Sequence, residues 1–425
     1  MVSRLASSIT RIFPAVRGVT GLTYQGKDPA REWPDTLDVA EMLKDGWRPR
    51  PFRQFLLKVH SRCNLACDYC YVYTLADQSW RSKPMIMDPD LVTAAAGRIA
   101  EHAAAHGTRS VRLILHGGEP LLAGHAYLRK VVETVRAAAG DELRVDAIVQ
   151  TNAVLLDEAA LRTFRELDVQ VGVSLDGGRR ANDRNRRYAD GRSSFDAVAD
   201  ALALLRGPEF RSQYAGLLCT VDLANDPVET YDALLQFAPP MVDFLLPHGT
   251  WESPPPYRSP NPENTPYGDW LIAVFDHWYG RSGETVVRLF QEIVNLMLGG
   301  ASASEAVGLT PSTLVVIETD GTIEQTDSLK VVRHGAPTTG LNVVDHPFDA
   351  ALEHPGIVAR QLGADALSDT CRACRFGRVC GAGLYPHRYR PGTGFLNPSV
   401  YCPDLYRLIE HIHNRLVGDL RRASR

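Results

Sequence analysis

Short apolar strands and amphipathic helices alternate along the chain from residue 53 to residue 246. Apolar or alternating runs predict six strands, over 54–59, 111–115, 144–150, 170–175, 214–221 and 241–246. Helical patterns separate these strands, over 89–105, 126–139, 157–167, 195–205 and 228–237. Such alternation predicts parallel strands joined by crossover helices, and therefore an α/β fold class. The pattern alone leaves two architectures open, a barrel and a doubly wound open sheet.

The pattern changes after the sixth strand. It predicts a proline-rich stretch, two helices, a β-hairpin and a last helix, over 251–265, 267–278, 285–298, 313–325 and 403–420. Asp320-Gly321 is the predicted turn of the hairpin. We expect four regions: an N-terminal extension, an α/β core, a helical bridge and a C-terminal region, over 1–50, 51–255, 256–310 and 311–425.

Composition and charge narrow the classes of function. The chain has 425 residues, 44% of them hydrophobic, and a net charge of −4, which predicts a globular protein with no pull toward nucleic acid. It contains no apolar run long enough for a membrane span. The first 21 residues carry Arg4, Arg11 and Arg17 but no continuous apolar segment, so they make a poor secretory signal. Eight cysteines, most at cluster-like spacings, indicate a reducing compartment, and we expect a cytoplasmic protein.

The first candidate chemical site is a cysteine run directly after the first predicted strand. Cys63, Cys67 and Cys70 follow the pattern C-x3-C-x2-C. Three thiolates so placed can hold three irons of a [4Fe–4S] cluster, and the lack of a fourth nearby cysteine leaves one iron open to another ligand. A zinc half-site or a set of buried core thiols is the alternative.

This run resembles the signature of the radical SAM superfamily, in which the open iron chelates S-adenosylmethionine (SAM). The resemblance implies a partial (β/α)6 TIM-type barrel with the site at the carboxyl ends of its strands. It also implies reductive cleavage of SAM, with electrons from a reductant such as flavodoxin or ferredoxin. Tyr69 occupies a position that lies against the adenine in this family; otherwise it is a loop tyrosine.

A Gly-Gly-Glu sequence follows the second predicted strand, as Gly117, Gly118 and Glu119. Glycines let a backbone approach a ligand closely, and a glutamate can accept hydrogen bonds from an ammonium group. Alone, this sequence is a common turn. After a C-x3-C-x2-C run, it resembles the motif that receives the amino group of SAM.

Other polar residues stand at or just after later strand ends. Ser174 and Arg186 resemble residues that bind the SAM carboxylate, and Asp176 resembles one that holds the ribose. Arg186 could instead be a surface arginine of a basic loop. Gln150 and Asn152 either face the cofactor or cap the next helix.

A second cysteine set lies near the C-terminus, and its members are Cys371, Cys374, Cys380 and Cys402. The set resembles a SPASM extension, which normally houses two auxiliary clusters. The cysteines that this pattern places around the hairpin are missing here. The resemblance therefore implies one auxiliary [4Fe–4S] cluster, fully ligated by cysteine, in a SPASM-like C-terminal domain. A structural zinc ribbon is the alternative.

Two further residues are catalytic candidates. Asp327 follows Thr326, where the SPASM pattern has a ligand, and in some SPASM enzymes an acid at this place takes a proton from the substrate. The alternative is a solvated aspartate at the end of a hairpin. His248, at the end of the sixth predicted strand, is either a substrate contact or a structural histidine.

The chain from Pro51 to Leu405 also resembles FxsB-type peptide maturases. The similarity rests on four segments, residues 52–63, 77–80, 246–251 and 383–389. It implies an oxidoreductase that binds a ribosomally made precursor peptide and forms a three-residue cyclophane, joining an aromatic ring carbon to a Cβ. The alternatives are a dehydrogenase similar to anaerobic sulfatase-maturating enzymes and a zinc-stapled binding protein without catalysis.

Overall fold

The computed structural model describes residues 32–423 except 282 and 284, so the three arginines of the N-terminal segment lie outside the described residues. Six parallel strands form its centre: β1 Gln54–His60, β2 Ser110–Gly117, β3 Arg144–Thr151, β4 Val169–Ser174, β5 Tyr214–Thr220 and β6 Met241–Leu245. Their order in the sheet is their order in the sequence. All five neighbouring pairs are parallel.

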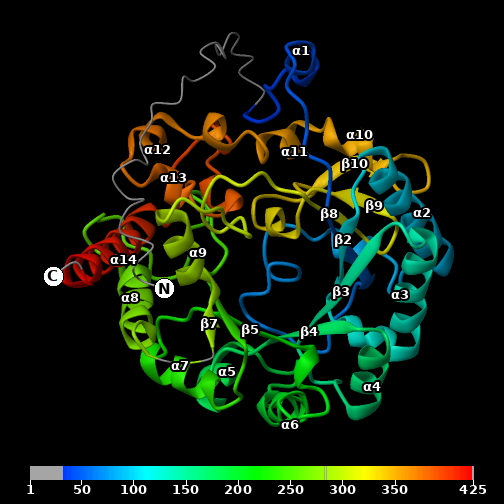
Figure 1. Ribbon diagram of the computed structural model, residues 1–425, viewed down its shortest axis with the longest axis horizontal. Coiled ribbons are helices and arrows are strands. Elements are labelled where there is room, and N and C mark those ends of the chain that lie inside the picture. The colour runs from blue at the N-terminus through cyan, green and yellow to red at the C-terminus, as the bar shows by residue number, and fades with distance from the viewer. Residues whose placement is uncertain (1–31, 282, 284, 424–425) are drawn as a thin grey trace.

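Sequential order decides between the two architectures that the sequence left open. A doubly wound sheet reverses its strand order at a switch point. Here no reversal occurs within β1 to β6, and the strands curve around a central space with helices outside them (Figure 1). The α/β class and the parallel sheet are therefore confirmed, in a partial barrel rather than a doubly wound sheet.

The outer helices match the predicted ranges closely: α2 Pro89–Ala105, α3 His125–Ala139, α4 Glu158–Glu166, α6 Phe195–Leu205 and α7 Pro227–Leu235. Three of them begin at an aspartate N-cap, where Asp88, Asp157 and Asp226 each accept a hydrogen bond from a backbone N–H of the first turn. A short helix, α5 Arg179–Asn185, was not predicted.

The sheet continues beyond the six strands on both sides. β7, Val286–Val287, pairs with β6 where a helix was predicted, because two valines suit a strand next to Met241 and Val242; helix α9 Arg288–Met297 follows. On the other side, β8 Leu314–Ile317 pairs in parallel with β1. β8 and β9 Thr322–Glu324 form the predicted hairpin, and β10 Thr338–Asn342 completes ten strands. The hairpin thus lies directly beside the strand that leads to the first cysteines.

The remaining helices surround the C-terminal part of the chain. Helix α8 Pro266–Trp278 packs against the last helix, α14 Cys402–Ala423. Five short helices complete the set: α1 Val39–Lys44, α10 Phe348–Leu352, α11 Pro355–Ala359, α12 Asp369–Ala373 and α13 Gly377–Cys380. In the described part of the chain, no helix has the length and apolarity to span a bilayer.

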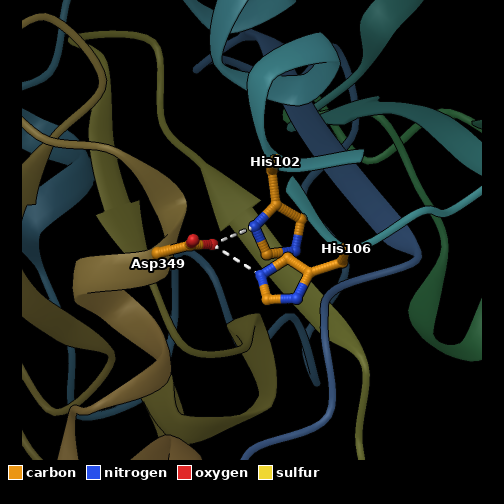
Figure 2. A group of neighbouring side chains, drawn as sticks. All are labelled: His102, His106 and Asp349. Atoms are coloured by element: carbon orange, nitrogen blue, oxygen red, sulfur yellow. Dashed lines mark hydrogen bonds and ion pairs between the residues drawn. The ribbon is translucent and has the colours of Figure 1, made fainter. Parts of the chain in front are cut away.

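A histidine clamp ties α2 to α10 (Figure 2). His102 Nε2 accepts the backbone N–H of Phe52 at 2.9 Å, so the ring proton is on Nδ1, which donates to Asp349 Oδ1 at 2.5 Å. His106 Nε2 lies 3.0 Å from the same oxygen. These three groups are close enough for a metal ion. However, ligation through His102 Nδ1 would move its proton to Nε2, against the Phe52 N–H, so the cluster is a structural link.

Candidate active site

One cavity of about 210 Å³ lies at the carboxyl ends of the parallel strands. Its wall includes most residues that the sequence singled out, from four strand ends, the C-cap of α5 and the cysteine loop: Cys63, Cys67, Tyr69, Cys70, Gly117, Gly118, Glu119, Gln150, Asn152, Ser174, Arg186 and His248. Among described residues, Asp176 and Asp327 do not line it. The fold thus brings together groups that are up to 185 positions apart, from Cys63 to His248.

The three cysteines lie in the loop after β1, where the N–H of Cys70 donates to the carbonyl of Cys67 at 3.1 Å. Burial raises the pKa of Cys63 to about 12 and that of Cys67 to about 11. Both are therefore protonated thiols in the free protein, and a metal must displace their protons on binding.

The spacing of the sulfur atoms tests what the cysteines can hold. Four thiolates on one zinc ion, with bonds of about 2.3 Å, would lie about 3.8 Å from one another. Within the described residues, neither cysteine set contains three sulfurs that all lie within 4.8 Å of one another. In the described part of the chain, neither set is therefore arranged as a site for a single zinc ion.

Gly117 and Gly118 serve the packing of the loop. A Cβ on Gly117 would lie 2.2 Å from the carbonyl oxygen of His60, and one on Gly118 would lie 1.8 Å from Tyr73 Oη and 2.4 Å from the Arg62 carbonyl oxygen. The two glycines therefore let the end of β2 approach the start of the cysteine loop. Both glycines also line the cavity, and their close approach to a ligand stays a prediction.

Glu119 links two strand ends beneath the cavity. Its carboxylate accepts hydrogen bonds from Thr151 Oγ1 at 2.6 Å and from the N–H groups of Asn152 at 2.8 Å and Leu121 at 3.0 Å. Burial raises the pKa of Glu119, and these donors oppose the rise. Glu119 thus fixes the end of β3 against the end of β2 while remaining on the cavity wall.

Asn152 connects β3 to the cysteine loop. Its side-chain amide donates to Asn64 Oδ1 at 2.8 Å and to Cys63 Sγ at 3.6 Å, while its Oδ1 accepts from the N–H of Val154. Next to it on the wall, Gln150 Nε2 donates to Ser174 Oγ at 3.0 Å. Gln150 and Asn152 therefore both face the cavity, and Asn152 also shapes the turn after β3.

Tyr69 is held by a buried aspartate and a buried arginine. Its hydroxyl donates to Asp176 Oδ2 at 2.5 Å and accepts from Arg186 Nη1 at 2.8 Å. Asp176 also accepts from the N–H of Thr220 at 2.9 Å. Arg186 is only 8% exposed, so the alternative of a surface arginine is wrong. Asp176 lies behind Tyr69 and acts on the cavity by orienting that ring.

The second cysteine set comes from three helices near the C-terminus. Cys371 is in α12, Cys374 caps it, Cys380 ends α13 and Cys402 begins α14. Burial, aided by the neighbouring Cys371 and Cys374, raises the pKa of Cys402 to about 11. The loop between the helices is tight, since a Cβ on Gly377 would lie 2.2 Å from the Cys371 carbonyl oxygen. Burial, aided by Cys402 and Cys371, also raises the pKa of Cys380, so the members of this set lie close enough to influence one another.

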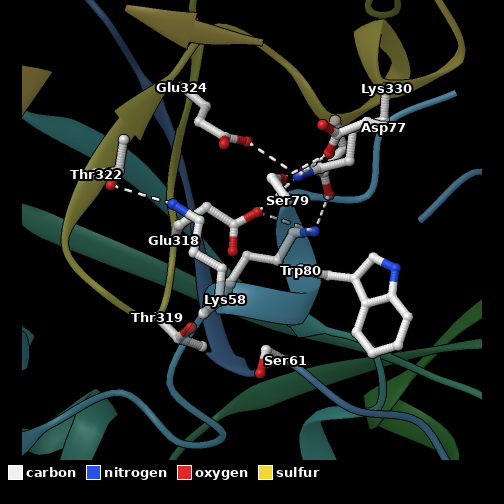
Figure 3. Close-up of polar contacts among 12 residues, drawn as sticks. Lys58, Ser61, Asp77, Ser79, Trp80, Glu318, Thr319, Thr322, Glu324 and Lys330 are labelled. Atoms are coloured by element: carbon white, nitrogen blue, oxygen red, sulfur yellow. Dashed lines mark hydrogen bonds and ion pairs between the residues drawn. The ribbon is translucent and has the colours of Figure 1, made fainter. Parts of the chain in front are cut away.

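A buried network of charges lies between β1 and the hairpin (Figure 3). Lys58 Nζ is 2.9 Å from Asp327 Oδ2, and Lys330 Nζ is 2.9 Å from Glu318 Oε1 and 3.2 Å from Glu324 Oε2. Asp327 is 5% exposed, so the alternative of a solvated hairpin-end aspartate is wrong. Sequence reasoning missed the two lysines, although Lys58 stands inside an otherwise apolar strand, which was the available signal.

Imidazole and phenol rings form another part of the cavity wall. The ring of His248 lies 4.8 Å from that of Tyr71 and 5.7 Å from that of His387, measured between centroids. Burial lowers the pKa of His248 to about 4. His116, at the end of β2, also lines the cavity, and its Nδ1 is 3.9 Å from Asp327 Oδ2. Sequence reasoning did not select His116, although its place directly after the second predicted strand was the available signal.

Comparisons with known proteins agree with this geometry. Residues 57–235, which span β1 to α7, match the family model of the Radical SAM superfamily. The cysteine-type anaerobic sulfatase-maturating enzyme of Clostridium perfringens is 24% identical over 381 residues, covering 87% of this chain and 98% of that protein. The serine-type enzyme of Klebsiella aerogenes is 25% identical over 378 residues, covering 86% of each chain.

Solved structures share the fold. That of anSMEcpe with bound AdoMet and Cp18Cys peptide has a TM-score of 0.72 at 23% identity, and covers 87% of this chain and 99% of that one. SuiB of Streptococcus suis, bound to its precursor peptide SuiA, has a TM-score of 0.53 at 14% identity, with coverages of 85% and 78%. The family match over residues 57–235 and the cysteine-lined cavity at the strand ends together indicate a radical SAM domain in this part of the chain.

Proposed function

We propose that this radical SAM enzyme is a peptide maturase that joins an aromatic ring carbon to a Cβ, as a three-residue cyclophane, in a ribosomally made precursor peptide. The observation that carries the proposal is the single cavity in which the cysteine loop and the SAM-contact candidates share a wall with the rings of Tyr71 and His248. An aromatic substrate side chain fits such a wall, because aromatic rings pack favourably at centroid distances of about 4.5–7 Å.

The donor sets support two [4Fe–4S] clusters. Cys63, Cys67 and Cys70 would hold the first, and the set of four cysteines in the SPASM-like region would hold the second. When bound, the first cluster and SAM supply a 5′-deoxyadenosyl radical that takes a hydrogen atom from the substrate. Tyr69, Ser174 and Arg186 would orient SAM, and flavodoxin or ferredoxin would supply the electron.

A peptide substrate is supported by what the relatives act on and bind. The curated relatives are named for maturating sulfatases, and two of the similar structures hold peptides, Cp18Cys in one and SuiA in the other. Ring closure removes two hydrogens from the peptide. One leaves as a hydrogen atom, and the other leaves as a proton and an electron. A fully ligated second cluster is suited to receive the electron.

The second candidate function is oxidation of a Ser or Cys side chain in a sulfatase, as the names of the curated relatives indicate. It is favoured by their identity of 24–25% over more than four-fifths of this chain. The buried network of charges counts against this second candidate. Lys58, Lys330 and their carboxylate partners lie around the hairpin, where the SPASM pattern has ligands of a further cluster. This chain would therefore use one auxiliary cluster instead of two.

Tandem mass spectrometry of a peptide encoded beside this gene, co-expressed anaerobically with the enzyme, tests the proposal. We expect the peptide to lose two hydrogens and to resist fragmentation between an aromatic residue and the residue two positions away. Co-expression with the Cys67→Ala variant is the control and should leave the peptide unmodified. A two-hydrogen loss confined to a Ser or Cys aldehyde, with the ring untouched, would replace the proposal by the second candidate.

A further inference from the structure

The acid that sequence reasoning selected does not itself reach the substrate cavity. Within the described residues, Asp327 is not on the wall, whereas His116 is. His116 Nδ1 lies 3.9 Å from Asp327 Oδ2, and Lys58 Nζ lies 2.9 Å from the same oxygen. The imidazole is thus on the cavity wall, whereas the carboxylate and the ammonium group are buried and off the wall.

His116 has the features of a proton acceptor. Its side chain is 21% exposed, yet in the described structure its Nδ1 is buried and has no hydrogen-bond partner. Burial lowers the pKa of His116, with Lys58 on β1 acting in the same direction, while Asp327 and Glu318 from the hairpin region oppose the shift. The ring is thus neutral near pH 7, and a proton that it receives is stabilised by the nearby carboxylates.

Asp327 has the features of a group that stabilises a protonated His116. The carboxylate is 5% exposed and makes an ion pair with Lys58. Neither of its oxygens has another hydrogen-bond partner in the described residues. The carboxylate can therefore receive an N–H from a protonated imidazole that turns toward it, in the manner of carboxylate–imidazole pairs in other enzymes.

We propose that His116 is the catalytic residue that receives the substrate proton, and that Asp327 is the positioning residue that stabilises the resulting imidazolium. The proposal rests on the proposed function. After a hydrogen atom has left the substrate Cβ, this carbon bonds to the aromatic ring. The ring then gives its ring proton to His116 and one electron to an acceptor, which restores aromaticity. An oxidised [4Fe–4S] cluster held by Cys371, Cys374, Cys380 and Cys402 would be that acceptor. His248 is the weaker base, since burial lowers its pKa to about 4.

Kinetic variants separate this step from the radical step. In His116→Gln, we expect SAM cleavage and transfer of deuterium from the substrate Cβ into 5′-deoxyadenosine to persist, while crosslinked product falls about 100-fold or more. Added imidazole should restore product in His116→Ala. His106→Gln, which alters an exposed histidine at the C-cap of α2, is the matched control and should behave as wild type. Full product formation by His116→Gln would overturn the proposal.

A spectroscopic readout is independent of turnover. In 15N-histidine-labelled holoenzyme, the His116 resonances are assigned by their loss in His116→Gln. Asp327→Asn should lower the pKa of His116, because a carboxylate that raises it has been removed. An unchanged His116 titration would overturn the coupling between the two residues.

These tests also distinguish failure of the inference from failure of the proposed function. If the wild-type enzyme yields an aldehyde, only the proposed crosslink is contradicted. The role of His116 is then tested by comparing the amount of aldehyde formed by His116→Gln and by the wild type. Wild-type enzyme that crosslinks the peptide, with His116→Gln equally active, contradicts only the assignment of His116.

Discussion

The two cysteine sites use the same ligand atoms but are built in different ways. The first takes its three cysteines from one loop, beside a cavity of about 210 Å³. The second takes its four from helices α12, α13 and α14 and from the C-cap of α12. The positive charge of Arg388 acts to lower the pKa of Cys380 in this set. The number of thiols and the space beside them therefore differ, although the chemistry of each sulfur does not.

This difference shows what makes a metal site reactive. A cluster with a cysteine on every iron has no position for a substrate, whereas three cysteines facing a cavity leave one iron exposed to it. The chain builds the exposed site where parallel strands end and polar side chains converge. The proposed second site lies where helices α12, α13 and α14 meet, and full cysteine ligation there would suit electron transfer.

The strongest test of this contrast removes one ligand from each site. We expect about eight irons per reconstituted wild-type chain, and about half of these in Cys67→Ala and in Cys402→Ala. SAM cleavage should be abolished in Cys67→Ala only, because only the first site has an open iron. Iron analysis and 5′-deoxyadenosine measurement check this. If both variants lost SAM cleavage and nearly all of their iron, the result would show that the two sites do not form independently.

A second test concerns the packing that holds the first site. Gly118→Ala should destabilise the protein by about 1–3 kcal/mol and impair cluster loading, because the new methyl group meets the Arg62 carbonyl oxygen. Gly97→Ala is the control: it lies in α2 with no atom within 4 Å of the added carbon, and should stabilise by up to about 1 kcal/mol. Urea unfolding measures both. Equal effects would contradict a special role for Gly118.

The smallest expected effect is a dependence of stability on pH at the cavity wall. The pKa of His248 is lowered by burial from 6.5 to about 4, so the unfolded state binds more protons between these values. The free energy of unfolding should therefore fall as pH drops from about 6.5, by roughly 1.5 kcal/mol at pH 5 from this residue. His248→Phe keeps a ring beside Tyr71 and should reduce the slope. An identical slope in the variant would exclude His248 as its source.

Much of the fold could be predicted from the sequence, because the periodicity of apolar residues is a local property. The six parallel strands and their helices lie within a few residues of the predicted ranges. The two-residue strand β7 was missed, since only its pairing with β6 distinguishes it from the first turn of a helix. The singly wound order of the sheet also became visible only in three dimensions.

The sequence by itself determined the chemistry that the chain carries: the cysteine spacings, the Gly-Gly-Glu turn and the polar residues at strand ends. The tertiary structure decided which groups meet. It buried Asp327 against Lys58, placed Asp176 behind Tyr69 and brought His116 to the cavity wall. Such contacts join residues far apart in the chain, and whether a charge is solvated or paired depends on burial, which no local pattern specifies.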